Sequence, residues 1–274
     1  MNYIISRGFI LLSMALLSIG IGFGQGLYWE STTVTKFAGA TEMHYSSCYR
    51  PHMFKQWSDK DATIFRLDKE IIYSIDNERK EYSEMTFSEM EKMAKKAGSE
   101  MDAQMAELKK QLADMPAEQR EAMEQMMGGK MKGSGEEAKL DVSKTGETKT
   151  ISGYKCTKYL IKENDKEFGT LWTTTSVPDF GAMQNDFKAF SQRMASLTTM
   201  RGSQMAAAMK KIDGFPVQTI IAGITLTVTK FEKRSIAASE FEVPSGYKKV
   251  KSENFMEREH GKKQQSEGEQ EQKD

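Results

Sequence analysis

The sequence predicts an α+β fold in which a long, curved antiparallel sheet carries helices packed on one face. Two patterns predict it. Runs rich in aromatic and β-branched residues, separated by turn residues, occupy both ends of the chain, whereas apolar residues recur every three or four positions in the middle. The expected order is therefore strands, helices, strands, helices and strands. Because long antiparallel sheets twist, helices on the concave side would leave a groove between the two layers.

Strands are expected where aromatic and β-branched residues are bounded by turn signals. Residues 27–37 (LYWESTTVTKF) form the first run and residues 43–49 the second. The segments Asp68-Lys69 and Asp76-Asn77-Glu78 suit the tight turns of an antiparallel meander. The remaining expected strands are residues 62–67, 70–75, 80–85, 155–162, 169–176, 217–222 and 224–231.

A Met-rich helical insertion is expected over residues 86–127. Apolar residues recur at threes and fours from Phe87 onward, which indicates a helix, and Pro116 suits the first position of a second helix. Residues 128–149 are rich in Gly, Ser, Lys and Glu and are expected to form a mobile loop. Two further helical segments are expected over residues 183–197 and 203–212.

The first 24 residues are predicted to be a secretory signal peptide. Arg7 supplies the basic region, residues 9–21 the apolar region, and the small residues before Gln25 a cleavage site after Gly24. The alternative is a retained membrane anchor, but the run is shorter than the roughly 20 apolar residues that a spanning helix needs. The expected mature protein is periplasmic or secreted, without a membrane span. It would comprise one domain over residues 25–250 and a disordered, charged tail over residues 251–274.

Charge and motif content argue against two broad classes of function. The chain has 39 basic and 39 acidic side chains, so removal of Arg7 with the signal peptide leaves 38 against 39, or a net charge of −1. No overall positive field would therefore attract nucleic acid. The sequence contains no G-x-S-x-G, P-loop or H-E-x-x-H motif, and the expectation is a protein that is not an enzyme and holds no cofactor.

The two cysteines, Cys48 and Cys156, leave two alternatives open. In an oxidising compartment they could pair as a disulfide, and otherwise they are two buried thiols that act as small hydrophobic side chains.

On an extended strand His44, Cys48 and His52 would share one face and could bind a soft metal. Their spacing matches no standard zinc pattern, and Pro51 interrupts the strand. The alternative is a pair of exposed histidines beside a structural cysteine.

The chain also contains 20 methionines, many of them in the helical insertion. Three interpretations fit their spacing. They are ordinary helix core, or an adaptable apolar surface, because thioethers are flexible, or ligands for Cu(I), because thioethers are soft.

Several stretches together resemble the bacterial domain-of-unknown-function family DUF4412. The matching stretches are LDK (67–69), IYSID (72–76), KEYSEM (80–85), MPAEQR (115–120), ISGYKCTKY (151–159), GFPV (214–217) and FEVPSGY (241–247). The family is similar in architecture to the periplasmic lipoprotein carriers LolA and LolB. The resemblance implies a half-barrel sheet wrapped on helices, in the envelope of a Gram-negative bacterium.

By analogy with those carriers, the expected function is non-catalytic binding of a hydrophobic ligand, either a lipid or a lipidated protein, in the groove between sheet and helices. The alternatives are a periplasmic copper-binding protein and a structural or protein-interaction module. The expected lining of the groove consists of aromatic and apolar side chains from strands and from the insertion: Trp29, Phe65, Ile72, Met90, Met101, Met105, Trp172 and Ile221.

Overall fold

The computed structural model describes residues 23–35, 41–113, 139–178, 180–195, 207, 210–252, 255 and 258. Within them, twelve strands form one sheet in the order β12-β6-β5-β4-β3-β2-β1-β11-β10-β9-β8-β7. Neighbouring strands are antiparallel, except that β12 runs parallel to β6. The strands are β1 (Phe23–Thr35), β2 (Thr41–Arg50), β3 (Met53–Trp57), β4 (Asp61–Arg66), β5 (Ile71–Asp76), β6 (Glu81–Thr86), β7 (Leu140–Ile151), β8 (Tyr154–Glu163), β9 (Lys166–Thr174), β10 (Phe215–Ile221), β11 (Ile224–Ala237) and β12 (Lys248–Lys249).

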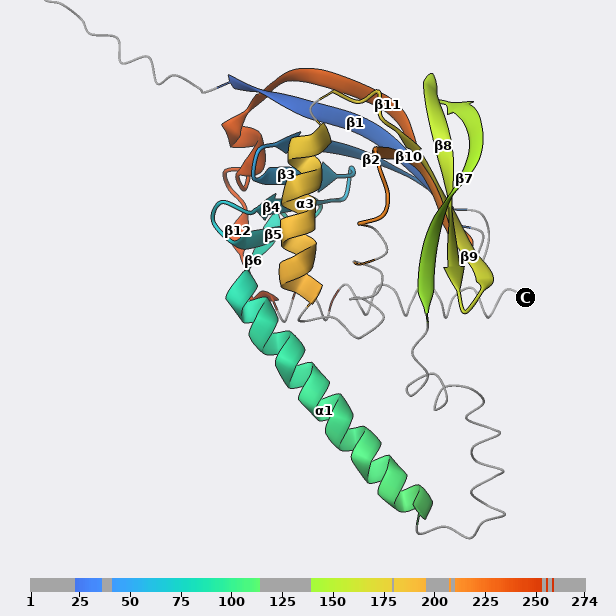
Figure 1. The fold of residues 1–274 in the computed structure, drawn as a ribbon. Helices are drawn as coiled ribbons and strands as arrows, with labels where there is room; N and C mark the ends of the chain where they lie inside the picture. The colour runs from blue at the N-terminus through green and yellow to red at the C-terminus, as the bar shows by residue number, and fades with distance from the viewer. Residues whose placement is uncertain are drawn as a thin grey trace, which may run out of the picture.

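The sheet is open and strongly curved, and helix α3 (Phe180–Ala195) lies inside the curve (Figure 1). The predicted curved antiparallel sheet is therefore confirmed. Short turns give the meander its shape. At the β10–β11 turn, Ala222 and Gly223 both have positive φ angles, of 48° and 77°, the conformation that a two-residue hairpin turn requires.

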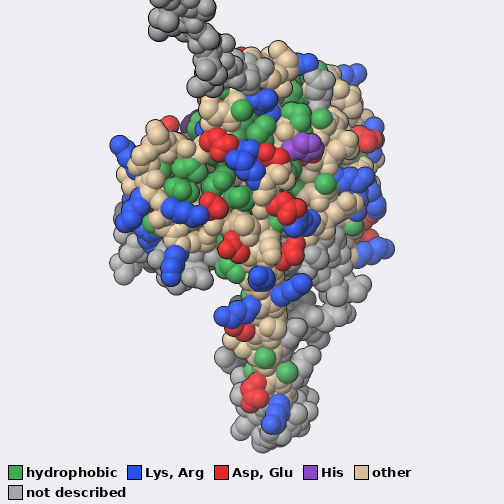
Figure 2. All heavy atoms as spheres, turned by 90° about the vertical axis from the view of Figure 1, so that its left-hand side faces the viewer, with side chains coloured by type: hydrophobic (Ala, Val, Ile, Leu, Met, Phe, Trp, Pro, Cys, Tyr) green, Lys and Arg blue, Asp and Glu red, His purple; other side chains and the backbone are tan. Residues whose placement is uncertain are grey.

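Helix α1 (Phe87–Ala113) begins at a capping box and then leaves the sheet. The Glu89 amide donates to the Thr86 hydroxyl, and the Thr86 amide donates to the Glu89 carboxylate, so each residue satisfies the other's backbone donor. Phe87 is buried, whereas Met93 is exposed, and the helix extends away from the body (Figure 1, Figure 2). The side chains of Met101 and Met105, and the second helix expected at Pro116, lie outside the described residues.

Two segments differ from the sequence-based expectations. Residues 140–149 were expected to belong to a mobile loop, but they form most of β7, an edge strand whose outer residues are solvated and polar. Edge strands carry such residues because charges prevent pairing with other chains, and this composition resembles that of a loop. Strand β3 was not expected, because Pro51 and His52 interrupt the run. They form the β2–β3 turn instead, with His52 at a φ of 64°.

The sheet is packed on both faces, because alternate residues of a strand point to opposite sides. Leu27 and Trp29 belong to one core cluster on the concave side, whereas Tyr28 belongs to another on the convex side. The convex cluster is closed by the fully buried Phe241, which ends the 3₁₀ helix Ala238–Phe241. The Arg66 guanidinium pairs with both Asp68 and Glu242, which ties this C-terminal segment to β4.

Strand β1 begins at Phe23, next to the cleavage point predicted after Gly24. The remainder of the predicted signal peptide, residues 1–22, lies outside the described residues, as does most of the predicted tail over residues 251–274. In the part of the chain that is described, no helix is both long and apolar enough to cross a membrane.

Candidate functional site

The concave face presents two rows of side chains that run across β2 to β6, one apolar and one polar. Cross-strand register places each row, because paired residues point to the same side of a sheet. The rows lie two residues apart on every strand, so they share one face. The apolar row is Tyr49, Phe54, Phe65, Ile72 and Met85, and the polar row is Ser47, Gln56, Thr63, Ser74 and Ser83.

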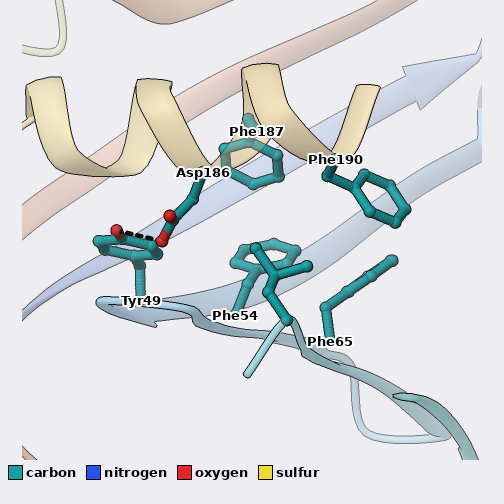
Figure 3. Close-up of a pocket in the computed structure, with 7 residues that line it drawn as sticks. Tyr49, Phe54, Phe65, Asp186, Phe187 and Phe190 are labelled. Carbon is teal, nitrogen blue, oxygen red and sulfur yellow. Dashed lines mark hydrogen bonds between the residues drawn. The ribbon is translucent and has the colours of Figure 1, made fainter. Parts of the chain in front are cut away.

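Helix α3 covers the part of the apolar row that contains Tyr49, Phe54 and Phe65 (Figure 3). Its Phe187 meets Phe54 with ring centroids 5.4 Å apart, and its Phe190 meets Phe65 at 5.6 Å. Phe190 also contacts Phe87 at the start of α1, with centroids 5.4 Å apart. All three contacts are tilted or edge-to-face, the arrangement that aromatic rings prefer. The covering layer therefore consists of phenylalanines on the inner side of the helix.

Asp186 fixes the middle of α3 to the turn between β2 and β3. Its Oδ2 accepts a hydrogen bond from the Tyr49 hydroxyl at 2.8 Å (Figure 3). The same oxygen accepts a hydrogen bond from the His52 amide at 2.7 Å, and Oδ1 of Asp186 lies 3.0 Å from Nδ1 of His52. Burial raises the pKa of Tyr49, and the hydrogen bond to the Asp186 carboxylate raises it further. Tyr49 therefore remains a hydrogen-bond donor at neutral pH.

Arg193 fixes the last turn of α3. Its guanidinium pairs with Glu70 of the β4–β5 turn and, at 3.2 Å, with Glu91 of α1. It also lies 5.1 Å from the centre of the Phe87 ring, within reach of a cation–π contact. The Arg193 hydrogen bond holds the pKa of Glu70 below its ordinary value. One side chain thus joins the sheet, α1 and α3.

The seam between α3 and the apolar row is closed. The space that remains there measures about 10 Å³, which is about the room that one water molecule needs. Phe54, Phe65 and Phe190 line it, together with Phe187, whose side chain is 39% exposed at the edge of the seam. The polar row, in contrast, borders a cavity of about 430 Å³, lined among others by Gln56, Thr63 and Ser74.

The expected groove residues fall into different places. Phe65 and Ile72 belong to the apolar row, and Trp29 stacks on Phe54 at 5.7 Å. Met90 is half-buried on α1. Trp172 is buried in the same cluster as Trp29, with the Lys149 ammonium 4.2 Å from its ring centre, whereas Ile221 packs against a separate cluster.

Among the residues that line the seam, Phe65 was expected from the sequence. Six others were not expected: Tyr49, Phe54, Leu67, Asp186, Phe187 and Phe190. A signal for Phe187 and Phe190 was present, because Phe180, Met183, Phe187 and Phe190 recur at threes and fours.

The expected cysteine and metal chemistry takes a different form. Cys48 and Cys156 are free, buried thiols in separate core clusters, so the structure shows the second alternative, two buried thiols, and not a disulfide. Burial raises the pKa of Cys48 to about 12.

His44 is exposed beside Thr32, and His52 is held at Asp186, so the structure does not bring these histidines to the buried thiol. Across the described ranges, no group of three His, Cys, Asp or Glu side chains could hold a metal ion.

Comparison with known proteins gives a family and weak structural similarities. The family model described as "Domain of unknown function (DUF4412)" matches residues 88–247, which include α1, α3 and β7 to β11. No curated protein matches the chain.

Among solved structures, an uncharacterized conserved protein from Thermus thermophilus is similar with a TM-score of 0.40 and 7% identity, over 82% of this chain and 90% of that one. PNGF-II is similar with a TM-score of 0.37 and 10% identity, and the match covers 84% of this chain but 31% of PNGF-II. At such scores neither likeness carries a functional inference.

Proposed function

This chain belongs to the DUF4412 family, and we propose that it is a non-catalytic envelope protein that binds an acyl chain, from a lipid or a lipidated protein. The chain would lie along the apolar row of the concave face, in the place of α3. One observation carries the proposal: α3 covers that row with Phe187 and Phe190, while one edge of the covering layer is open to solvent.

Burial of an acyl chain offsets the cost of uncovering Phe187 and Phe190 of α3. Uncovering two phenylalanines costs roughly 3–6 kcal/mol, whereas burying about ten methylene groups gains about 8 kcal/mol. The Arg193–Glu70 attachment of α3 adds little resistance, because both side chains are substantially exposed and surface ion pairs are weak. The hydrogen bonds from the Tyr49 hydroxyl and the His52 amide to Asp186 add more, because the Asp186 side chain is only 14% exposed. An acyl chain therefore competes with the aromatic side chains of the helix for the same apolar row.

Two further features support an envelope carrier. A curved sheet with a helix inside its curve is the arrangement expected of a LolA-like half-barrel. The predicted signal peptide over residues 1–24 would deliver the chain to the compartment in which acylated lipids and lipoproteins are exposed.

The test uses a BODIPY-labelled hexadecanoic acid and the full chain purified from an expressing bacterium. Fluorescence anisotropy is expected to show saturable binding at one site. Ile72→Glu, which places a charge in the apolar row, should weaken binding at least about tenfold, because an unpaired charge resists desolvation. Ile72→Thr repeats the test with a smaller perturbation if the first variant folds poorly.

Ile220→Glu is the matched control. Ile220 lies on β10, outside the apolar row, and is 37% exposed, so the same substitution there should leave the affinity within about twofold. Absence of saturable binding to the unmodified chain would overturn the proposal, and so would an Ile72→Glu variant that binds as well as the Ile220→Glu control.

A structural or interaction module is the second candidate, and helix α1 favours it. The helix is 27 residues long, yet among its described side chains Phe87 alone is fully buried. Sedimentation of the full chain and of a Met93→Lys variant tests self-association through this helix. A dimer that Met93→Lys dissociates would support this candidate, and a monomer in both samples would contradict it.

A further inference from the structure

The polar row borders a cavity of a size typical of small-molecule sites. Its volume of about 430 Å³ falls within the roughly 300–1,000 Å³ of ligand pockets. Gln56, Thr63 and Ser74 come from three adjacent strands and oppose one another in register, so their amide and hydroxyl groups form a continuous floor. These three polar side chains face open space and not packed core, which points to a polar occupant.

The charges around the cavity select against an anionic occupant. Asp61 and Asp76 oppose each other across β4 and β5, Glu78 follows in the next turn, and Lys60 is the one cation among the lining residues. The Asp61 carboxylate accepts a hydrogen bond from Ser58 at 2.6 Å, and the Asp76 carboxylate accepts one from the Arg79 amide at 2.9 Å. Because the Asp61 and Asp76 carboxylates already accept hydrogen bonds from neighbouring residues, a bound cation is not needed to neutralise them.

The buried end of the polar row contains a hydroxyl without a partner. The Oγ of Ser47 is fully buried and makes no hydrogen bond within the described structure, although Ser47 pairs across the strands with Gln56 of the cavity floor. A buried polar group without a partner costs about 1–3 kcal/mol. Ser47 does not line the cavity, so this cost belongs to the packed layer beside Gln56 and not to the cavity itself.

The cavity also has aromatic walls. Tyr45 of β2 and Phe255 near the C-terminus both line it. Sugar rings combine hydroxyl groups that donate and accept hydrogen bonds with C–H faces that pack on aromatic rings. The hydroxyl, amide, carboxylate and aromatic groups around this cavity are complementary to both features.

The two rows are contiguous, because Phe54 and Gln56 lie two residues apart on β3, as Phe65 and Thr63 do on β4, a separation of about 6.6–6.8 Å. We infer that the cavity binds the uncharged, polyhydroxylated head group of an amphiphile whose acyl or alkyl chain lies along the apolar row. This inference rests on the proposed function and specifies its ligand as a neutral glycolipid.

The test compares three probes with the same dodecyl chain below their micellar concentrations: dodecyl maltoside, dodecylphosphocholine and dodecanoate. Isothermal titration of the full chain is expected to give the tightest binding for the maltoside. Gln56→Leu and Thr63→Val should each weaken maltoside binding at least about fivefold, because each removes a hydrogen-bonding partner worth about 1 kcal/mol. Neither variant should change dodecanoate binding.

Thr148→Val on the exposed edge strand β7 is the matched control and should change no affinity. Ile72→Glu should weaken all three probes. If the maltoside binds no better than the phosphocholine and Gln56→Leu weakens neither, the head-group inference is overturned, while dodecanoate binding still upholds the proposed function. If no dodecyl compound binds, the proposed function itself fails, and this inference with it.

Discussion

Phe54 of β3 and Phe187 of α3 meet edge to face, with ring centroids 5.4 Å apart and ring planes inclined by 69°. The contact joins residues 133 positions apart in the sequence, since 187 − 54 = 133. It lies between the sheet and the one described helix that occupies the concave face (Figure 3). The strength of this contact therefore measures how firmly α3 covers the apolar row.

Phe187→Ala is expected to lower the free energy of unfolding by about 2 kcal/mol, which is less than the 3–5 kcal/mol of a fully buried phenylalanine because its ring is partly exposed. Urea unfolding measures the change. Met93→Ala on α1 is the control, because Met93 is also 39% exposed but belongs to the part of α1 that leaves the body, and it should cost less than about 0.5 kcal/mol. Equal effects would show that α3 is not packed on the sheet as described.

Tyr49→Phe should remove a part of the alkaline sensitivity of the fold. Burial and the Asp186 hydrogen bond raise the pKa of Tyr49 above its ordinary value of 10.0. The folded state therefore keeps this proton where the unfolded state loses it, and stability falls as the pH rises above 10. Urea midpoints measured between pH 9 and 11 should fall less steeply for Tyr49→Phe, and an unchanged slope would contradict the assignment.

Cys48 should not react with a thiol reagent such as DTNB at pH 8 while the protein is folded. Its pKa is raised to about 12 by burial, and the thiolate is the reactive form. Cys156 is likewise buried with a raised pKa, so both thiols should become reactive only in denaturant. Rapid labelling of the native protein, or fewer than two reactive thiols after unfolding without reductant, would argue against two free buried cysteines.

Arg193→Gln should reduce the acid sensitivity of the fold. The pKa of Glu70 lies below its ordinary value of 4.5 because Arg193 hydrogen-bonds its charged form. This stabilisation is present above pH 4.5 and is lost as the pH falls through the lowered pKa. The urea midpoint should therefore fall less between pH 5 and 3 in Arg193→Gln than in the unmodified chain. Lys96→Gln, whose ion pair with Glu100 is solvent-exposed, is the control and should behave like the unmodified chain.

The fold was predictable where turn residues and strand patterns agree. Strands β4 to β6 lie within about one residue of their expected bounds, because the turns at Asp68-Lys69 and Asp76-Asn77-Glu78 separate short alternating runs. Strand β7 was not predicted because an edge strand has few buried side chains and so lacks an apolar pattern. Strand β3 was not predicted because it follows Pro51, and its pairing with both β2 and β4 depends on distant residues.

The site was less predictable than the fold, because it depends on cross-strand register. Phe65 and Ile72 could be chosen from their strands, but their alignment with Tyr49 and Phe54 is fixed only when four strands pair. The separation of the apolar row from the polar row likewise depends on how these strands pair. Sequence patterns also could not decide whether Trp29 lines a groove or packs in the core. Its stacking with Phe54 and Phe231 places it in the core.

The most direct test of α3 as an exchangeable cover is amide hydrogen exchange across residues 180–193, with and without saturating dodecanoate. Exchange there should accelerate when the acid binds, because the chain replaces the aromatic contacts that hold the helix, while exchange in the central strands β1 and β11 stays unchanged. Saturation of the binding site without faster exchange in α3 would contradict its role as the cover.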